Sequence, residues 1–331
     1  PTQSISIMTF NVENLFDTKH DAGKDDYTYL PAALKNSTEH RERCEKVPVK
    51  RWREQCLYWD WTQEIVNYKY RKIADVIRQV DGGRGADILV FQEVENKALL
   101  ETLRIDYLAD LGYGETILIE GRDLRGIDVA FLSRLPLASE PTLHAIDFRE
   151  IEQRRLDDTR GILQADFRLP DGAVLTGFAV HFPAPFHPYP LRIDSYNTLD
   201  RLVRSLPAGQ PAFAAGDFNT PAAEDREHGI IDRYAKKSWR IAHQEGCSDC
   251  PGTHYYAPKD EWSFLDMIVV RRVEATGTPP SGWKLDTAKT RIITSGQDQM
   301  DENGYPNGFE ISPLSGVSDH LPLVIELTKT N

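Results

Sequence analysis

The chain has 331 residues, of which 40% are hydrophobic, and it carries 51 Asp and Glu against 39 Lys and Arg, a net charge of −12. This length and apolar content suffice for one large core or two modest ones, and no run of 18 apolar residues exists that could span a membrane. The acidic balance argues against a protein that coats nucleic acid by neutralising phosphates. It does not exclude a phosphoester-cleaving enzyme, because a bound divalent cation supplies local positive charge.

Strand-like and helix-like segments alternate along the whole chain, with no linker or repeat to mark a boundary, so we expect a single domain over residues 1–331. A polar, aromatic-rich insertion at about 18–61 separates the first strand from a helix at about 62–80. Many strands and few helices favour two packed sheets flanked by helices over a doubly wound parallel sheet. The expected strands are residues 5–11, 86–91, 127–133, 160–168, 173–181, 212–216, 264–270 and 321–327, with further helices at about 97–109 and 191–205.

Four cysteines form two close pairs, Cys44 with Cys56 and Cys247 with Cys250. Even, local pairing favours two disulfide loops and an oxidising compartment. The absence of an initial Met fits a secreted or periplasmic chain that has lost its signal peptide, and fits a cleaved tag equally well. An alternative for the second pair is a zinc site, because an H-x3-C-x2-C-x3-H array offers plausible ligands: His243, Cys247, Cys250 and His254.

Polar side chains recur at the ends of the expected strands. If these ends converge, up to five negative charges share one pocket, which like-charge repulsion and desolvation disfavour unless a cation is bound. Ligands that are all oxygen indicate Mg²⁺, Mn²⁺ or Ca²⁺ rather than zinc. The acids are Glu13, Glu93, Asp217, Asp266 and Asp319, accompanied by Asn11, His181, Asn219 and His320.

Seven motifs follow one another over some 300 residues: N-V-E-N-L-F-D at 11–17, Q-E-V-E-N at 92–96, R-G-I-D-V-A-F-L-S at 125–133, V-H-F at 180–182, G-D-F-N at 216–219, S-F-L-D at 263–266 and S-D-H at 318–320. In this order they resemble the endonuclease/exonuclease/phosphatase superfamily, the deoxyribonuclease I-like fold. The opening motif and the insertion are similar to bacterial members, many of them secreted. The resemblance implies a four-layered α/β sandwich: two mostly antiparallel β-sheets packed face to face, with helices outside.

The resemblance also implies a metal site. Glu93 would be the principal ligand, helped by Asn11 and Asp319, and Glu13 stands where relatives often carry an acid. Mg²⁺ is the expected ion, with Mn²⁺ or Ca²⁺ as alternatives.

Catalytic roles are implied for His181, Asp217, Asn219, Asp266 and His320, and a phosphate-binding role for Arg160. His320 would lie against the scissile phosphate, with its ring held by Asp266. Asp217 would orient or deprotonate the attacking water. The phosphate-binding residues would be Asn219, Arg160, which lies where relatives place a phosphate-contacting arginine, and His181, which matches a second histidine of the deoxyribonuclease I-like nucleases.

On this basis we expect a divalent-metal-dependent phosphodiester hydrolase, an extracellular nuclease that cleaves DNA or RNA by in-line attack of water. A phosphatase or phosphodiesterase acting on small or lipid phosphoesters, such as inositol phosphate or sphingomyelin, is the first alternative, and the acidic net charge keeps it open. A non-catalytic binding module on the same fold is the second. No obligate protein partner is evident.

Several further residues have two interpretations. The aromatic and basic side chains of residues 46–70 could stack and neutralise a single strand, or could cover a sheet edge. Asp128 reads as a structural partner of Arg125 or Arg160, and His187 and His254 read as surface or substrate-rim residues. Residues 298–304 contain acids before a glycine, but their spacing fits a solvated loop better than a calcium loop.

Overall fold

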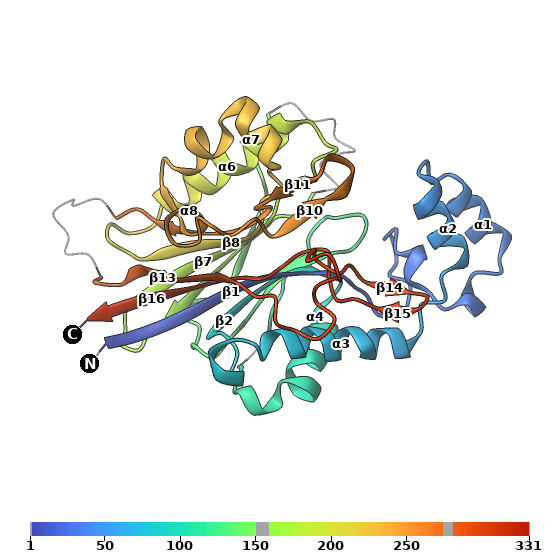
Figure 1. Ribbon diagram of the computed structural model, residues 1–331, viewed down its shortest axis with the longest axis horizontal. Helices are drawn as coiled ribbons and strands as arrows, with labels where there is room; N and C mark the ends of the chain where they lie inside the picture. The colour runs from blue at the N-terminus through green and yellow to red at the C-terminus, as the bar shows by residue number, and fades with distance from the viewer. Residues whose placement is uncertain (1, 115, 150–158, 274–280, 331) are drawn as a thin grey trace.

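The computed structural model describes residues 2–114, 116–149, 159–273 and 281–330. Two six-stranded sheets pack face to face, and helices cover both outer faces (Figure 1). The expected four-layered sandwich is therefore confirmed. Within the described residues, no helix is long and apolar enough to cross a membrane.

The first sheet has the order β13-β16-β1-β2-β4-β3. Its central pair, β1 and β2, is parallel, and the other neighbours are antiparallel. The strands are β1 (Thr2–Leu15), β2 (Ile88–Val94), β3 (Thr116–Ile117), β4 (Asp128–Ser133), β13 (Lys284–Ile292) and β16 (Leu323–Thr330).

The second sheet has the order β5-β6-β7-β8-β12-β9, again with one parallel pair, β7 and β8. Apolar side chains from the facing sheets, including Ile7 and Val90 from one and Phe167 and Phe213 from the other, form the central core. The strands are β5 (Thr142–His144), β6 (Ile162–Arg168), β7 (Val174–His181), β8 (Ala212–Asp217), β9 (Trp239–Ile241) and β12 (Asp266–Arg271).

Helices α3 (Gln63–Ile77) and α4 (Lys97–Thr102) cover the first sheet, and α6 (Tyr189–Arg204) covers the second. Helix α3 begins where the Thr62 hydroxyl accepts a hydrogen bond from the Ile65 amide, as an N-cap does. The other helices are α1 (Thr38–Glu45), α2 (Lys50–Tyr58), α7 (Ala222–His228) and α8 (Ala242–Gly246), and two hairpins pair β10 (His254–Tyr256) with β11 (Glu261–Ser263) and β14 (Glu310–Ile311) with β15 (Leu314–Ser315).

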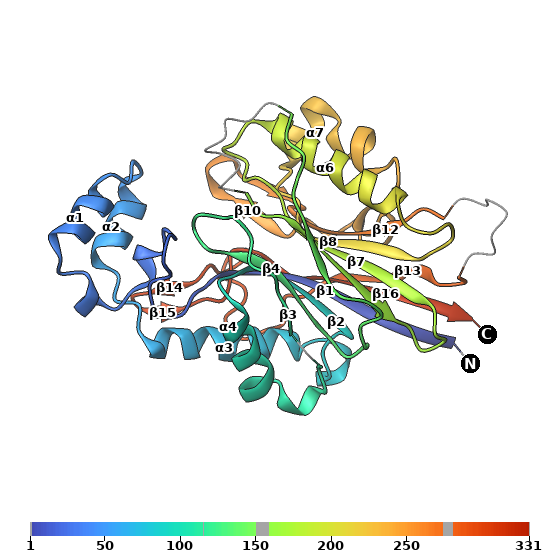
Figure 2. The same ribbon diagram turned by 180° about the vertical axis from the view of Figure 1, so that it is seen from behind.

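The insertion, which contains α1 and α2, lies at one end of the molecule beside β14 and β15, far from the two termini (Figures 1 and 2). Cys44 and Cys56 link its two helices with a Cα–Cα distance of 5.6 Å, within the disulfide range. Of the two interpretations of residues 46–70, coverage of the sheet fits Trp61, Lys69 and Tyr70, which are buried against the first sheet. These side chains supply core contacts there and are inaccessible to a strand of nucleic acid.

Every strand expected from the sequence exists, with boundaries shifted by a few residues. The most extended is β1, which continues through the site motif to Leu15. Strand β13 was not predicted, because Lys284–Ile292 mixes charged and apolar residues as an exposed edge strand does.

A buried carboxyl group joins the end of β2 to the start of the insertion. Glu95 is 3% exposed, and its Oε2 accepts a hydrogen bond of 2.8 Å from the Asp17 amide. Burial, together with the nearby carboxylates of Asp17, Asp21 and Asp26, raises its pKa to about 9. The side chain is therefore neutral in the folded protein at pH 7.

We predict that the Glu95→Gln variant is more stable than the wild type at pH 8 by roughly 1–3 kcal/mol, because the wild-type carboxylate must bind a proton as the chain folds and the amide need not. Between pH 4.5 and about 9 the unfolded chain ionises Glu95 while the folded chain keeps it protonated, so wild-type stability falls as pH rises through this window. Denaturant unfolding in EDTA at pH 4 and pH 8 measures the difference, which should vanish at pH 4.

Glu101 provides the matched control. Its carboxylate accepts hydrogen bonds from Thr116 and Arg104, which lower its pKa. The Glu101→Gln variant should therefore be less stable than the wild type at pH 8. A Glu95→Gln variant that also loses stability at pH 8 would contradict the assignment of a neutral Glu95.

Candidate active site

The topology brings the polar strand ends to one edge of the sandwich. Parallel pairing aligns Asn11 with Gln92 in the first sheet and His181 with Asp217 in the second. Strand β12 runs antiparallel to β8 and sets Asp266 opposite Asp217. Strand β16 begins at this same edge, so the Ser318–His320 segment that precedes it arrives there too. Residues far apart in the sequence thus meet at one place.

Irregular backbone aims the side chains into the space between the sheets. The β1–β2 register shifts between Asn11 and Leu15, as a bulge does. Glu13, Asn14, Glu93 and Asn219 adopt left-handed φ angles of 49°, 60°, 65° and 49°. Such angles are unfavourable for residues other than glycine, and they concentrate where a structure holds functional groups in place.

One glycine is required at this edge. Gly216 precedes Asp217 with a φ of 147°, and a Cβ there would lie 1.9 Å from the Val180 carbonyl oxygen. The absence of a side chain lets β7 and β8 approach closely just before His181 and Asp217 leave them.

His320 lies at the centre of one group of charges. Its Nδ1 is 2.7 Å from Asp266 Oδ2, and its Nε2 is 3.9 Å from Asp217 Oδ2. Burial alone would lower the pKa of His320, but the carboxylates of Asp266 and Asp319 hold it well above its ordinary value. Burial and the neighbouring Asp266 raise the pKa of Asp217 to about 8. The imidazole is therefore the charged partner at neutral pH.

His181 lies on the other side of Asp217, with its Nε2 3.5 Å from Asp217 Oδ2. Burial, followed by the positive charge of Arg160, lowers the pKa of His181 well below its ordinary value. Its Nδ1 is buried without a hydrogen-bond partner among the described residues. Asn219 connects Asp217 to the segment after β7, because its backbone amide donates to Asp217 Oδ1 and its side chain donates to the Phe182 carbonyl.

A second group of charges surrounds Lys69, which is 2% exposed. Its ammonium donates to the carbonyl oxygens of Val12 and Glu13, at 3.1 and 2.6 Å, and lies over the ring of Phe309. The carboxylates of Glu13, Glu93 and Asp319 all act on this ammonium, yet burial lowers its pKa to about 8.

The four residues expected to bind metal lie around this lysine. The Asn11 side chain donates to Glu93 Oε1 at 3.5 Å and to Asp217 Oδ2 at 3.2 Å, which links the two charged groups. Glu13 Oε2 accepts from the Asp319 amide at 2.9 Å. Burial and the charge of Asp319 raise the pKa of Glu13 to about 8, so below that pH this carboxyl holds a proton that a bound cation would displace.

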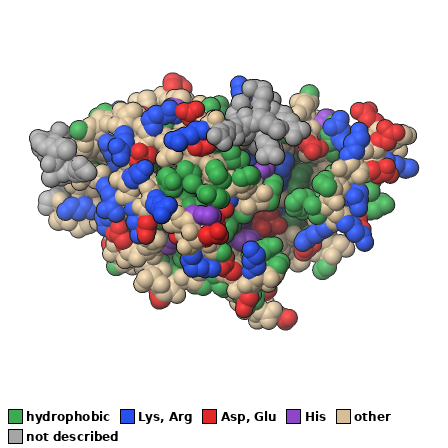
Figure 3. Space-filling model, turned by 90° about the horizontal axis from the view of Figure 1, so that it is seen from above, with side chains coloured by type: hydrophobic (Ala, Val, Ile, Leu, Met, Phe, Trp, Pro, Cys, Tyr) green, Lys and Arg blue, Asp and Glu red, His purple; other side chains and the backbone are tan. Residues whose placement is uncertain are grey.

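Glu93 from the group around Lys69, together with Asp217 and His320 from the other group, lines a cavity of about 130 Å³. The space-filling view shows acidic and histidine side chains gathered in a hollow near the middle of the molecule (Figure 3). Arg160 reaches the cavity as expected, with its Nη1 2.9 Å from Asp123 Oδ1 and its buried Nε without a partner among the described residues. The lining residues are Glu93, Arg125, Arg160, His181, Ala184, Phe186, His187, Asp217, Asn219 and His320.

Three residues of the site escaped the sequence analysis. Lys69 lies in helix α3, and Arg125 lies in a loop, where its Nη2 donates to Asn14 Oδ1 at 2.6 Å. His254, expected at the surface or the substrate rim, is instead hydrogen-bonded through Nδ1 to the Asp319 carbonyl, and its ring centroid lies 4.9 Å from that of His320. The signal for Lys69 was a lysine on the apolar face of an amphipathic helix.

Other expectations are corrected in detail. Asp128 is structural, but its Oδ1 accepts from the Gly121 amide instead of pairing with an arginine. The four residues of the zinc alternative do not form one ligand group in the structure: Cys247 and Cys250 pair with each other, His243 stacks on Phe264, and His254 is hydrogen-bonded to the Asp319 carbonyl. The loop at 298–304 is tied by its own contacts, including Asp301 Oδ1 with the Tyr305 amide.

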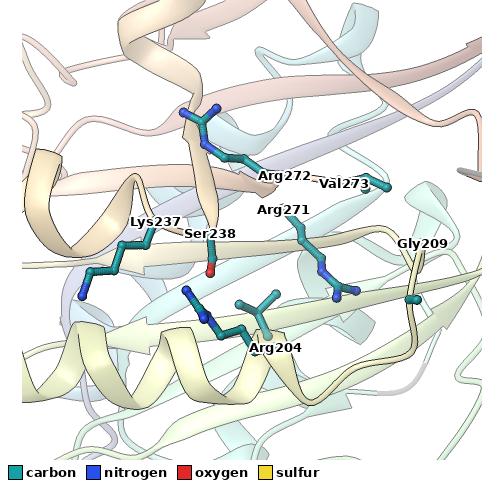
Figure 4. A pocket seen from close by; sticks show the side chains of 9 residues that line it. Arg204, Gly209, Lys237, Ser238, Arg271, Arg272 and Val273 are labelled. Atoms are coloured by element: carbon teal, nitrogen blue, oxygen red, sulfur yellow. The ribbon is translucent and has the colours of Figure 1, made fainter. Parts of the chain in front are cut away.

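A second, larger hollow of about 250 Å³ lies at the far end of β12 from Asp266, beside the end of α6 (Figure 4). Arg204 and Arg271 line it together with Ser238, Lys237 and Arg272. No carboxylate or imidazole is among the described residues of its lining. It therefore lacks the acid–base groups that ester hydrolysis needs.

Known proteins share this architecture. The family model described as Endonuclease/Exonuclease/phosphatase family matches residues 8–320. A family member from Bacteroides thetaiotaomicron is 16% identical with a TM-score of 0.59, and each chain is covered completely. A humanised Danio rerio TDP2 is 14% identical with a TM-score of 0.58, covering 98% of each chain. Comparison with curated proteins gives no match. The chain belongs to the endonuclease/exonuclease/phosphatase family, whose members are generally phosphoesterases or nucleases.

Proposed function

We propose that this protein is a divalent-metal-dependent phosphodiesterase that cleaves nucleic acid. The observation that carries the proposal is the Asp266–His320 pair, 2.7 Å apart, facing Asp217 in a cavity that also contains Glu93 and two arginines. A buried imidazolium held by the Asp266 carboxylate is suited to neutralise a phosphoryl oxygen. The description of the family, which names endonucleases, exonucleases and phosphatases, agrees with phosphoester chemistry.

The residues around Lys69 fit a divalent cation. Glu13, Glu93 and Asp319 provide three carboxylates for one buried ammonium, which leaves an excess of two negative charges when all three are ionised. Asp319 remains 48% exposed at its side chain, so solvent reaches the group. Oxygen donors of this kind select Mg²⁺, Mn²⁺ or Ca²⁺. When bound, the cation would neutralise phosphate charge and favour ionised Glu13.

We assign the remaining chemistry to the chain's own side chains. The carboxylate of Asp217 has a pKa raised to about 8, near the working pH, which suits a base that orients or deprotonates water. The His320 imidazolium donates to the phosphoryl oxygen, and Asp266 fixes its tautomer and orientation. Arg160 and neutral His181 supply further donors to the phosphate, while Asn219 holds Asp217 in place.

We also propose that the protein functions in an oxidising compartment, outside the cytosol. Both cysteine pairs lie at disulfide distance, with Cα–Cα separations of 5.6 and 5.3 Å. Disulfides persist in secreted and periplasmic proteins, whereas cytosolic reductants keep thiols reduced.

The direct test is hydrolysis of plasmid DNA, RNA and a small phosphodiester, bis-p-nitrophenyl phosphate, with Mg²⁺ and with EDTA. We predict nicking of nucleic acid that EDTA abolishes and Mg²⁺ restores, and a fall in kcat of about 10²–10⁴-fold in the Asp217→Asn variant. Asp171→Asn, which removes a carboxylate paired with Lys329 away from the site, is the matched control and should retain activity. Turnover of the small ester alone would support a phosphatase instead, and inactivity on every substrate would support a binding module.

The Asp266→Asn variant tests the His320 assignment through pH. Because the folded pKa of His320 is raised, activity that depends on the imidazolium is present at neutral pH and is lost as pH rises through that pKa. Removing the charge of Asp266 lowers this pKa, so the alkaline loss of kcat should begin at a lower pH than in the wild type. An unchanged alkaline limb in the pH–rate profile would refute the imidazolium role.

A further inference from the structure

The segment that follows His181 is held in one conformation by a buried arginine. Arg192, in the first turns of α6, is fully buried, and its Nη1 donates to the carbonyl oxygens of Pro183, Ala184 and His187 at 3.1, 2.8 and 3.2 Å. Its Nε donates to Glu224 at 2.8 Å, and its Nη2 pairs with the same carboxylate. Burying a guanidinium is unfavourable unless its donors are satisfied, and here the loop carbonyls and Glu224 satisfy them.

This loop contains three prolines and no glycine among residues 183–188, which further restricts its backbone. The His187 amide also donates to the Ala184 carbonyl at 2.9 Å, closing a turn. The backbone of this loop is therefore preorganised. Binding a ligand beside it costs little additional backbone entropy.

The loop carries Phe186, whose ring is 76% exposed. A single exposed apolar side chain is ordinary on a protein surface. Phe186 differs in its position, because it lines the same cavity as His181, Asp217 and His320. Its ring lies 4.3 Å from that of His187, at a tilt of 40°, so one face remains open to solvent. Folding gains little from this ring, whereas a planar ligand would gain a stacking partner.

We propose that Phe186 is a stacking platform for a nucleobase next to the phosphate that is cleaved. This inference rests on the proposed function and narrows its substrate to nucleic acid with an unstacked base. Arg125 and Arg160 line the same cavity and attract the phosphate, while the aromatic ring accepts any base through its π face. A lipid surface is a poorer occupant, because the cavity beside Phe186 is lined mostly by charged and polar side chains, including Glu93, Asp217 and Arg160.

Phe186→Ala and Phe186→Trp are compared with the wild type on two single-stranded oligonucleotides. One carries bases throughout, and the other carries abasic tetrahydrofuran nucleotides on both sides of one linkage. We expect Phe186→Ala to lower kcat/KM on the oligonucleotide with all its bases by about 5- to 150-fold. The same variant should cleave the abasic linkage as the wild type does. Phe186→Trp should restore the kcat/KM that Phe186→Ala loses. Tyr58→Ala, which removes an equally exposed aromatic ring from the insertion, is the control and should match the wild type.

A second readout separates this inference from the proposed function. Stacking on Phe186 should quench the fluorescence of a 2-aminopurine oligonucleotide, in EDTA, for the wild type and Phe186→Trp but not for Phe186→Ala. Quenching that depends on Phe186 supports the platform even if no oligonucleotide is cleaved. The absence of cleavage would contradict the proposed function alone. Any of three results would overturn the platform. They are an equal loss of kcat/KM on both oligonucleotides in Phe186→Ala, quenching that does not depend on Phe186, and a loss of binding to phosphatidylglycerol vesicles in Phe186→Ala without a change in cleavage.

Discussion

Two buried cations hold five carboxylates together at one edge of the sandwich, and the rest of the site depends on this balance. Lys69 is surrounded by Glu13, Glu93 and Asp319, and His320 by Asp266 and Asp217. The Asn11 amide donates to a carboxylate of each group. Like charges at these separations repel strongly in a dry environment. Burial, followed by the charges of Asp319 and Asp266 respectively, raises the pKa values of Glu13 and Asp217 to about 8 despite the two internal cations.

The fold supports this arrangement with irregular geometry at the ends of regular strands. The parallel pairs β1–β2 and β7–β8 deliver four strand ends to one edge, and the central core holds them there. Left-handed residues then turn Glu13 and Glu93 inward, and Gly216 lets the neighbouring strands approach. The buried Arg192 fixes the adjoining loop by its carbonyl oxygens. The left-handed residues lie at the proposed active site. The packing of the apolar strands in the central core offsets the energetic cost of their φ angles.

Much of this could be predicted from the sequence, because each site acid or amide follows or precedes a short apolar run. That pattern identified Asn11, Glu93 and Asp217 at strand ends, and it indicated two packed sheets. It could not identify Lys69, whose burial depends on carboxylates contributed by other strands. Arg192 was missed for a similar reason, since its partners are backbone carbonyls of an irregular loop. Strand β13 was missed because an edge strand tolerates charge along its length.

The central claim is that the residual negative charge around Lys69 is a site for a divalent cation. Thermal unfolding of the wild type and of Glu93→Gln, each titrated with Mn²⁺ and Mg²⁺ without substrate, tests it most directly. We expect the wild-type Tm to rise with cation concentration and to saturate, because a ligand that binds only the folded state stabilises it. We expect little or no rise for Glu93→Gln. A wild-type Tm insensitive to both cations, or an equal rise in both proteins, would contradict the claim.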